Sequence, residues 1–148
     1  MNRWDRRLAL FLRASAIILG SAIVATLMPL SLMASLSRWV SIAEMPETPI
    51  VSYLARSCSA MYAMLGLLYW RVSLDVPRYR ELIRFLALCK LAFGIGILAI
   101  DFLVGMPTWW VYSEGPFIIV WSLTLLLLKH KADSCRKGSS SPDAESEK

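Results

Sequence analysis

Three charged residues near the ends of long apolar segments are the residues best suited to chemistry in this sequence. Arg56, Asp101 and Glu114 lie within or beside the second, third and fourth of these segments. If each segment crosses a membrane as a helix, all three residues lie at one depth, near the outer face. A charge inside a span is costly and calls for a partner. Since one guanidinium can pair two carboxylates, we expect an Arg56–Asp101–Glu114 cluster.

Helical spacing indicates that this cluster faces the interior of a helix bundle. One face of the second segment carries small and polar residues at spacings of 4, 3, 4 and 3, namely Ser52, Arg56, Ser59, Ala63 and Gly66. Small residues allow close helix packing in lipid, and Ala16 and Gly20 offer the same feature in the first segment. Two interpretations stay open. The cluster either locks the register of the helices or lines a polar pocket that binds a small ligand, a lipid headgroup or a partner.

Lys90 is the fourth candidate site residue. It shares a helical face with Gly94, Ile97 and Asp101 but lies deeper in the membrane than Asp101. Its long side chain could extend to the inner face and contact a lipid phosphate. The alternative is a role in proton transfer at a buried site.

The remaining reactive residue types form no recognisable catalytic or metal set. Three cysteines, Cys58, Cys89 and Cys135, occur without a Cys-x-x-Cys motif, and His130 is the single histidine. These residues favour neither a disulfide framework nor a metal site. The sequence also contains no glycine-rich phosphate loop and no nucleophile–base pair, so we expect no cofactor and disfavour an enzyme.

The composition indicates a membrane protein rather than a soluble domain. Of the 148 residues, 57% are hydrophobic and 18% are charged, and the mean hydropathy is +0.54. Soluble domains are about half apolar and about a quarter charged. We therefore predict an all-α integral membrane four-helix bundle. Its expected spans are about residues 8–33, 50–70, 82–104 and 113–128.

The bundle is expected to form a single domain over residues 1–131, followed by a disordered cytoplasmic tail over residues 132–148. Pro29 is expected to kink the first span near its exit. A cleaved signal peptide is the alternative for this first segment, but its apolar stretch is longer than such peptides usually have.

Two local motifs predict how the helices begin and connect. After the first span, Leu36, Trp39, Val40 and Ala43 recur at helical spacing, which predicts a short helix in the membrane interface. Ser113 is predicted to cap the start of the fourth span, with Glu114 and Pro116 in the first turn.

The basic residues predict the orientation of the chain. They follow or precede the spans in three groups: Arg3, Arg6, Arg7 and Arg13; Arg71, Arg78, Arg80 and Arg84; and Lys129, Lys131, Arg136 and Lys137. The other two loops contain only Arg38. By the positive-inside rule, both termini are cytoplasmic in a bacterial-type inner membrane. We therefore attribute the net charge of +5 to the basic residues that orient the chain in the membrane, and we expect no nucleic-acid partner.

Two short sequences resemble those of small four-helix bacterial membrane proteins of the DoxX-like kind. They are Tyr53-Leu-Ala-Arg56, with Ala60, Tyr62 and Gly66 after it, and Asp101-Phe-Leu-Val-Gly105-Met-Pro107. The resemblance spans about residues 8–130 and implies a four-helix membrane bundle. It carries over no catalytic residue, and the connector and Lys90 depart from it.

These features favour a non-enzymatic accessory or scaffold subunit of the inner membrane. Its expected partners are the lipid bilayer and either another membrane protein or a second copy of the chain. The alternative is a small-molecule or lipid binding or transport protein that uses the polar site near the outer face.

Overall fold

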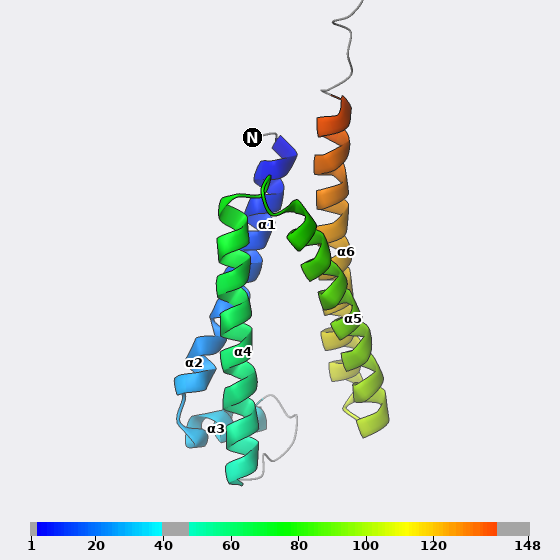
Figure 1. Ribbon diagram of the computed structural model, residues 1–148. Coiled ribbons are helices and arrows are strands. Elements are labelled where there is room, and N and C mark those ends of the chain that lie inside the picture. Colours follow the sequence, from blue (N-terminus) through cyan, green and yellow to red (C-terminus); the bar gives the residue numbers. More distant parts are fainter. Residues whose placement is uncertain (1–2, 40–47, 139–148) are drawn as a thin grey trace, which may run out of the picture. The chain divides into compact units, whose positions relative to one another are not determined.

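The computed structural model describes residues 3–39 and 48–138, and all regular structure in these two ranges is helical. The helices are α1 (Arg3–Gly20), α2 (Ala22–Leu27), α3 (Leu30–Trp39), α4 (Pro49–Leu74), α5 (Arg80–Val104) and α6 (Thr108–Gly138). The all-α prediction is confirmed for these residues (Figure 1).

Four helical stretches are long and apolar enough to cross a membrane, as the sequence predicts. They are Arg3–Leu27, which joins α1 and α2, Pro49–Leu74, Arg80–Val104 and Thr108–Cys135. The chain divides into two units, which are described separately. The α5–α6 unit comprises Met1–Phe11 and Asp75–Lys148, and the α4 unit comprises Leu12–Leu74. Packing of all four spans into one bundle stays a prediction.

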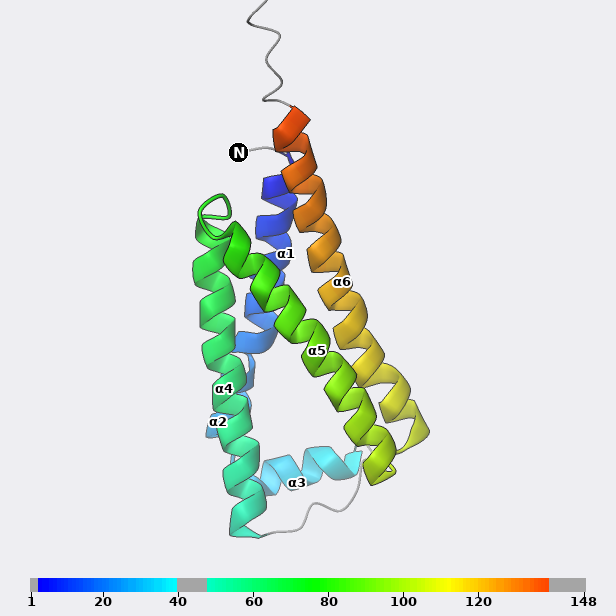
Figure 2. The ribbon, with the colours of Figure 1, turned by 45° about the vertical axis from the view of Figure 1, so that its right-hand side comes forward.

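In the α5–α6 unit, the two long helices lie side by side (Figures 1 and 2). Glycines allow their close approach. A Cβ atom at Gly94 would lie 2.9 Å from Ile118 Cγ2, and one at Gly115 would lie 2.8 Å from Leu98 Cβ. Small residues thus serve here as contact points between apolar helices, as is usual in membranes.

In the α4 unit, the end of α1 crosses α4 at backbone contact distance. A Cβ atom at Gly66 would lie 2.6 Å from the Gly20 nitrogen and 2.9 Å from the Ala16 carbonyl oxygen. Helix α2 also packs on α4. The predicted small face of α4 is buried at Ala63 and Gly66 but exposed at Arg56.

The first span differs from the prediction of one kinked helix over residues 8–33. It breaks at Ser21, between α1 and α2, and again at Met28, which is extended with ψ 136°. Pro29 explains the second break, because a proline disfavours helical geometry in the residue before it. Helix α3 then runs crosswise to α4, near the first turns of α4 (Figure 2). It covers the first half of the predicted interfacial helix, and residues 40–47 lie outside the described residues.

The fourth span begins earlier than predicted. Gly105, at φ +74°, ends α5 in the left-handed conformation that glycine adopts readily. The Pro107 carbonyl then accepts hydrogen bonds from the nitrogens of Trp110 and Val111, at 2.8 and 3.2 Å. Ser113 is therefore inside α6, not its N-cap, and its hydroxyl donates to the Trp110 carbonyl.

The end of the fourth span also differs from the prediction. Helix α6 continues to Gly138, so the first part of the tail predicted as disordered, from Ala132, is helical. Ala132 is buried, and an ion pair between Lys129 and Asp133 links successive turns. Both features stabilise a helix beyond the apolar stretch. Residues 139–148 lie outside the described residues.

Candidate functional site

A cluster of ion pairs joins three helices at one end of the α5–α6 unit. Arg80, the first residue of α5, donates from Nη2 to Asp5 Oδ1 on α1 at 2.6 Å, and from Nη1 to Asp133 Oδ1 on α6. Lys129 Nζ lies 2.8 Å from Asp133 Oδ2 and 3.9 Å from Glu81 Oε1. These contacts hold the beginnings of α1 and α5 against the last turns of α6.

Three of the five side chains in the cluster are largely removed from water, whereas those of Asp133 and Glu81 are 31% and 85% exposed. The side chains of Arg80 and Lys129 are each 13% exposed and that of Asp5 is 9% exposed. A guanidinium that bridges two carboxylates satisfies charges that would be costly to bury alone. Arg80 and its two carboxylates therefore act as a three-helix connection.

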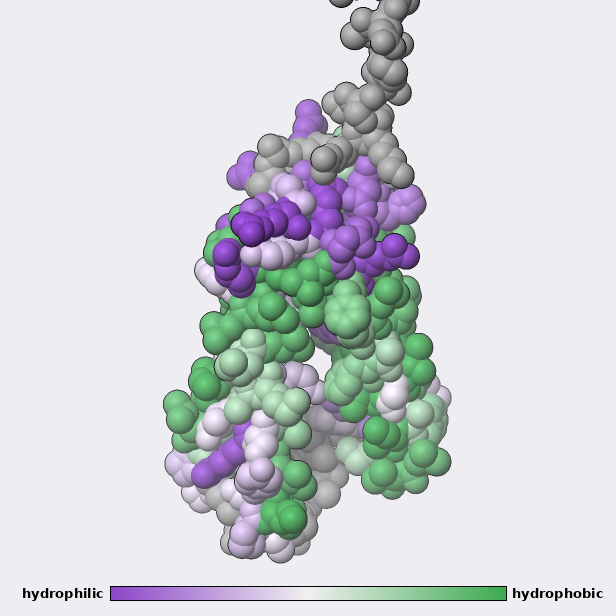
Figure 3. All heavy atoms as spheres, in the orientation of Figure 1, coloured by the Kyte–Doolittle hydropathy of each residue, from purple (hydrophilic) through white to green (hydrophobic). Residues whose placement is uncertain are grey.

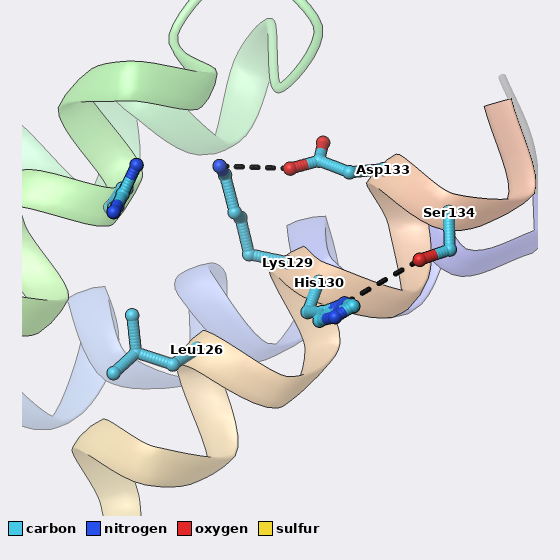
Figure 4. Close-up of a pocket in the computed structure, with 6 residues that line it drawn as sticks. Leu126, Lys129, His130, Asp133 and Ser134 are labelled. Carbon is cyan, nitrogen blue, oxygen red and sulfur yellow. Dashed lines mark hydrogen bonds and ion pairs between the residues drawn. The ribbon is translucent and has the colours of Figure 1, made fainter. Parts of the chain in front are cut away.

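A pocket of about 390 Å³ adjoins this cluster. It is lined by Arg84 of α5 and by Leu126, Lys129, His130, Asp133 and Ser134 of α6. Figure 4 shows Lys129 directed to Asp133, and His130 near Ser134 on the next turn. The Ser134 hydroxyl lies 3.5 Å from His130 Nδ1. Ligand pockets typically have volumes of about 300–1,000 Å³.

The charges around the pocket are unevenly balanced. Asp133 is paired with both Lys129 and Arg80. Arg84 is exposed and has no ion-pair or hydrogen-bond partner within residues 3–39 and 48–138. The pocket therefore combines one paired carboxylate with a guanidinium that has no partner in the part of the chain that the structure describes.

Basic residues and tryptophan surround this end of the unit. Residues 3–7, 75–84 and 129–135 contain eight Arg and Lys against four Asp and Glu. Figure 3 shows hydrophilic side chains gathered where α1 begins and α6 ends, next to hydrophobic helix surfaces. The Trp4 ring lies 4.7 Å from Arg7 Cζ and 5.1 Å from Lys131 Nζ. This combination is typical of the boundary between lipid and water.

The predicted outer cluster is divided between the two units. Arg56, in the α4 unit, donates from Nη2 to the Met28 carbonyl oxygen at 3.4 Å. That carbonyl is available because the helix breaks at Met28. Asp101 and Glu114 belong to the α5–α6 unit. The pairing of Arg56 with these carboxylates stays a prediction.

Within the α5–α6 unit, Asp101 and Glu114 lie close enough for their charges to interact. The Trp110 side chain also lies beside the Glu114 carboxylate. Asp101 is only 6% exposed, and its Oδ2 has no hydrogen-bond partner among the described residues. Asp101 and Glu114 thus lie near each other on neighbouring helices, and the predicted site stays a prediction.

Lys90 is half-buried on α5, and its Nζ lies 5.6 Å from the centre of the Trp121 ring on α6. Phe11 and Phe117 pack on the same tryptophan, with ring centres 4.6 and 5.4 Å away. A cation over an aromatic face is favourable, so Trp121 offers Lys90 a partner that spacing arguments missed. Lipid contact and proton transfer both stay predictions for Lys90.

Sequence reasoning missed the ion-pair cluster. It assigned Arg80 and Lys129 to orientation alone and did not consider Asp5, Glu81 or Asp133. A signal was present, because each of these acidic residues lies at the basic end of a different span. Membrane orientation by the positive-inside rule requires only basic residues at these ends. An acidic residue among them therefore indicates an ion pair with a specific basic side chain.

The described residues contain no group of three or more His, Cys, Asp and Glu side chains that could hold a metal ion. No protein-family model, curated protein or solved structure matches the chain.

Proposed function

We propose that this protein is a non-enzymatic accessory or scaffold subunit of the bacterial inner membrane, which binds a partner through α4. The observation that carries the proposal is the exposure of α4. Only 11% of its most apolar stretch is buried, the smallest share among the four candidate spans, and it is also the least hydropathic of them. A span that is both uncovered and weakly apolar is poorly suited to lipid and well suited to a neighbouring helix.

The exposed residues of α4 support a protein partner. They include Tyr53, Met61, Tyr62 and Met64. Tyrosine and methionine are enriched at protein interfaces, and methionine adapts to irregular surfaces. The partner is another membrane protein or a second copy of the chain.

Site-specific photocrosslinking in the native membrane tests the proposal. We expect p-benzoylphenylalanine at Met61, which is 73% exposed, to yield one crosslinked protein product of constant size. The matched position is Ile95 of α5, which is 56% exposed and is expected to crosslink lipid only. A product of twice the chain mass identifies a second copy. Crosslinking at Met61 within the chain, or equal yields at both positions, contradicts the proposal.

The second candidate function is small-molecule or lipid binding at the outer polar site. The buried Oδ2 of Asp101, which has no hydrogen-bond partner within the described ranges, favours it. A buried carboxylate oxygen without a donor is costly, and a cationic ligand would satisfy it. This candidate replaces the first if Met61 captures no protein. The purified wild type, but not Asp101→Asn, would then retain a small molecule in native mass spectrometry.

The proposed orientation places both termini in the cytoplasm. It is supported by the basic residues at the ends of the spans and by the ion pairs that join the start of α1 to the last turns of α6. The DoxX-like resemblance and the interfacial position of α3 also belong to this proposal.

Cysteine labelling tests this orientation. With Cys58 and Cys89 replaced by serine, we expect Cys135 to resist a membrane-impermeant maleimide in intact spheroplasts and to react after permeabilisation. Cys135 is exposed, so access to the reagent decides the result. The control is Arg38→Cys in a cysteine-free background, which should react in intact spheroplasts. Labelling of Cys135 before permeabilisation would reverse the orientation.

A further inference from the structure

The pocket between the beginning of α5 and the last turns of α6 has the chemistry of a phosphate site. Arg84 contributes a positive charge that has no ion-pair partner among the described residues, and the Ser134 hydroxyl lies against His130. When that hydroxyl donates to His130 Nδ1, the imidazole carries its proton on Nε2 and presents a further N–H donor. Guanidinium and imidazole N–H groups both donate hydrogen bonds to phosphate oxygens.

The paired residues beside the pocket supply a rigid wall. Asp133 would repel an anion if its charge were unbalanced, but Lys129 and Arg80 both pair with it. Lys129 is 13% exposed and held between Asp133 and Glu81, so it is ordered without a ligand. Arg84 has no ion-pair partner among the described residues, so its charge dominates the pocket.

An apolar stripe on α6 leads away from the polar residues of the pocket. Leu123, Leu127, His130 and Ser134 are spaced 4, 3 and 4 residues apart and thus share one helical face. Leu123 and Leu127 are both exposed, as is Leu88, one turn beyond Arg84 on α5. If a lipid binds with its phosphate near His130 and Ser134, its hydrocarbon chain can pack along this face.

We propose that this pocket binds the phosphate group of an anionic phospholipid, with Arg84 as its main charge and His130, oriented by Ser134, as an additional donor. The pocket lies at the ends of two candidate spans, Arg80–Val104 and Thr108–Cys135, which is the depth of lipid headgroups. Basic pockets between helices at the cytoplasmic side are suited to such headgroups. A free phosphate ion shares the polar chemistry but gains nothing from the apolar stripe.

Native mass spectrometry of the full chain in detergent tests the site with phosphatidylglycerol and phosphatidylcholine as probes. We expect one phosphatidylglycerol to bind in preference to phosphatidylcholine. Arg84→Gln should lower its occupancy about fivefold. Arg84 forms no ion pair with another described residue, so this variant should fold normally. Arg84→Lys keeps the charge and should retain most of the binding.

The matched control is Arg6→Gln. Arg6 is exposed at the same end of the unit, does not line the pocket and has no partner among the described residues. It should leave lipid occupancy unchanged. An equal loss in both variants, or equal binding of the two lipids, overturns the proposal because general surface charge would then explain the result.

Inorganic phosphate separates the two sources of the phosphate group. If millimolar phosphate leaves the phosphatidylglycerol adduct intact, the lipid is the ligand, as proposed. If phosphate displaces the lipid from the wild type and itself binds in an Arg84-dependent manner, the pocket is a site for a free anion and the lipid assignment is overturned.

Discussion

Replacing Arg80 with methionine is expected to destabilise the protein by about 3 kcal/mol. The change keeps an unbranched apolar side chain but removes the guanidinium that pairs with Asp5 and Asp133. Asp5 is nearly buried, so its carboxylate would lose its partner without regaining water. A single buried charge left unpaired typically costs about 3–5 kcal/mol, whereas a surface pair contributes at most about 1 kcal/mol.

Equilibrium unfolding in detergent with increasing dodecyl sulfate measures this change. The control is Arg6→Met, which removes an exposed charge with no partner among the described residues and should cost less than about 0.5 kcal/mol. Similar losses in the two variants would mean that the α1–α5–α6 ion pairs do not stabilise the fold.

A double substitution distinguishes a broken ion pair from lost packing. Asp5→Asn removes the buried negative charge, so adding it to Arg80→Met should recover part of the stability lost in Arg80→Met alone. This non-additivity is expected for charges in direct contact. Strict additivity would show that the methionine side chain, rather than the missing charge, causes the loss.

The four apolar helices were predictable from the sequence because each is a run of mostly apolar residues long enough to cross a membrane. The approach of small residues was also predictable, since Gly20 and Gly66 lie on the faces that helical spacing assigns to packing. Both features follow from one segment at a time. They require no knowledge of which helix lies beside which.

The start of α6 and the ion-pair cluster were not predictable in the same way. The sequence at Ser113 favours a helix start there. Helix α5 instead ends at Gly105, and α6 begins directly after Pro107, at Thr108. The cluster requires Asp5 and Asp133 to meet Arg80 across more than 50 positions of sequence in each direction. Local spacing contains no information on such a contact.

The second large change in stability is expected where α1 crosses α4. We expect Gly66→Ala to destabilise the protein by about 1–3 kcal/mol, because the new methyl group would lie 2.6 Å from the Gly20 nitrogen. The neighbouring atoms belong to the helix backbone and cannot rotate away. The two helices must therefore separate and lose contacts along their length. Dodecyl sulfate unfolding measures this loss as well.

Gly96→Ala is the matched control and should not destabilise the protein. Gly96 is also inside a span, but a Cβ atom there would meet nothing within 4 Å. Alanine is favoured over glycine within a helix by up to about 1 kcal/mol, so this variant should be as stable as the wild type or more so. This difference attributes the Gly66 effect to the crossing rather than to helix propensity, which favours alanine at both positions. A Gly66→Ala protein as stable as Gly96→Ala would exclude backbone contact between α1 and α4.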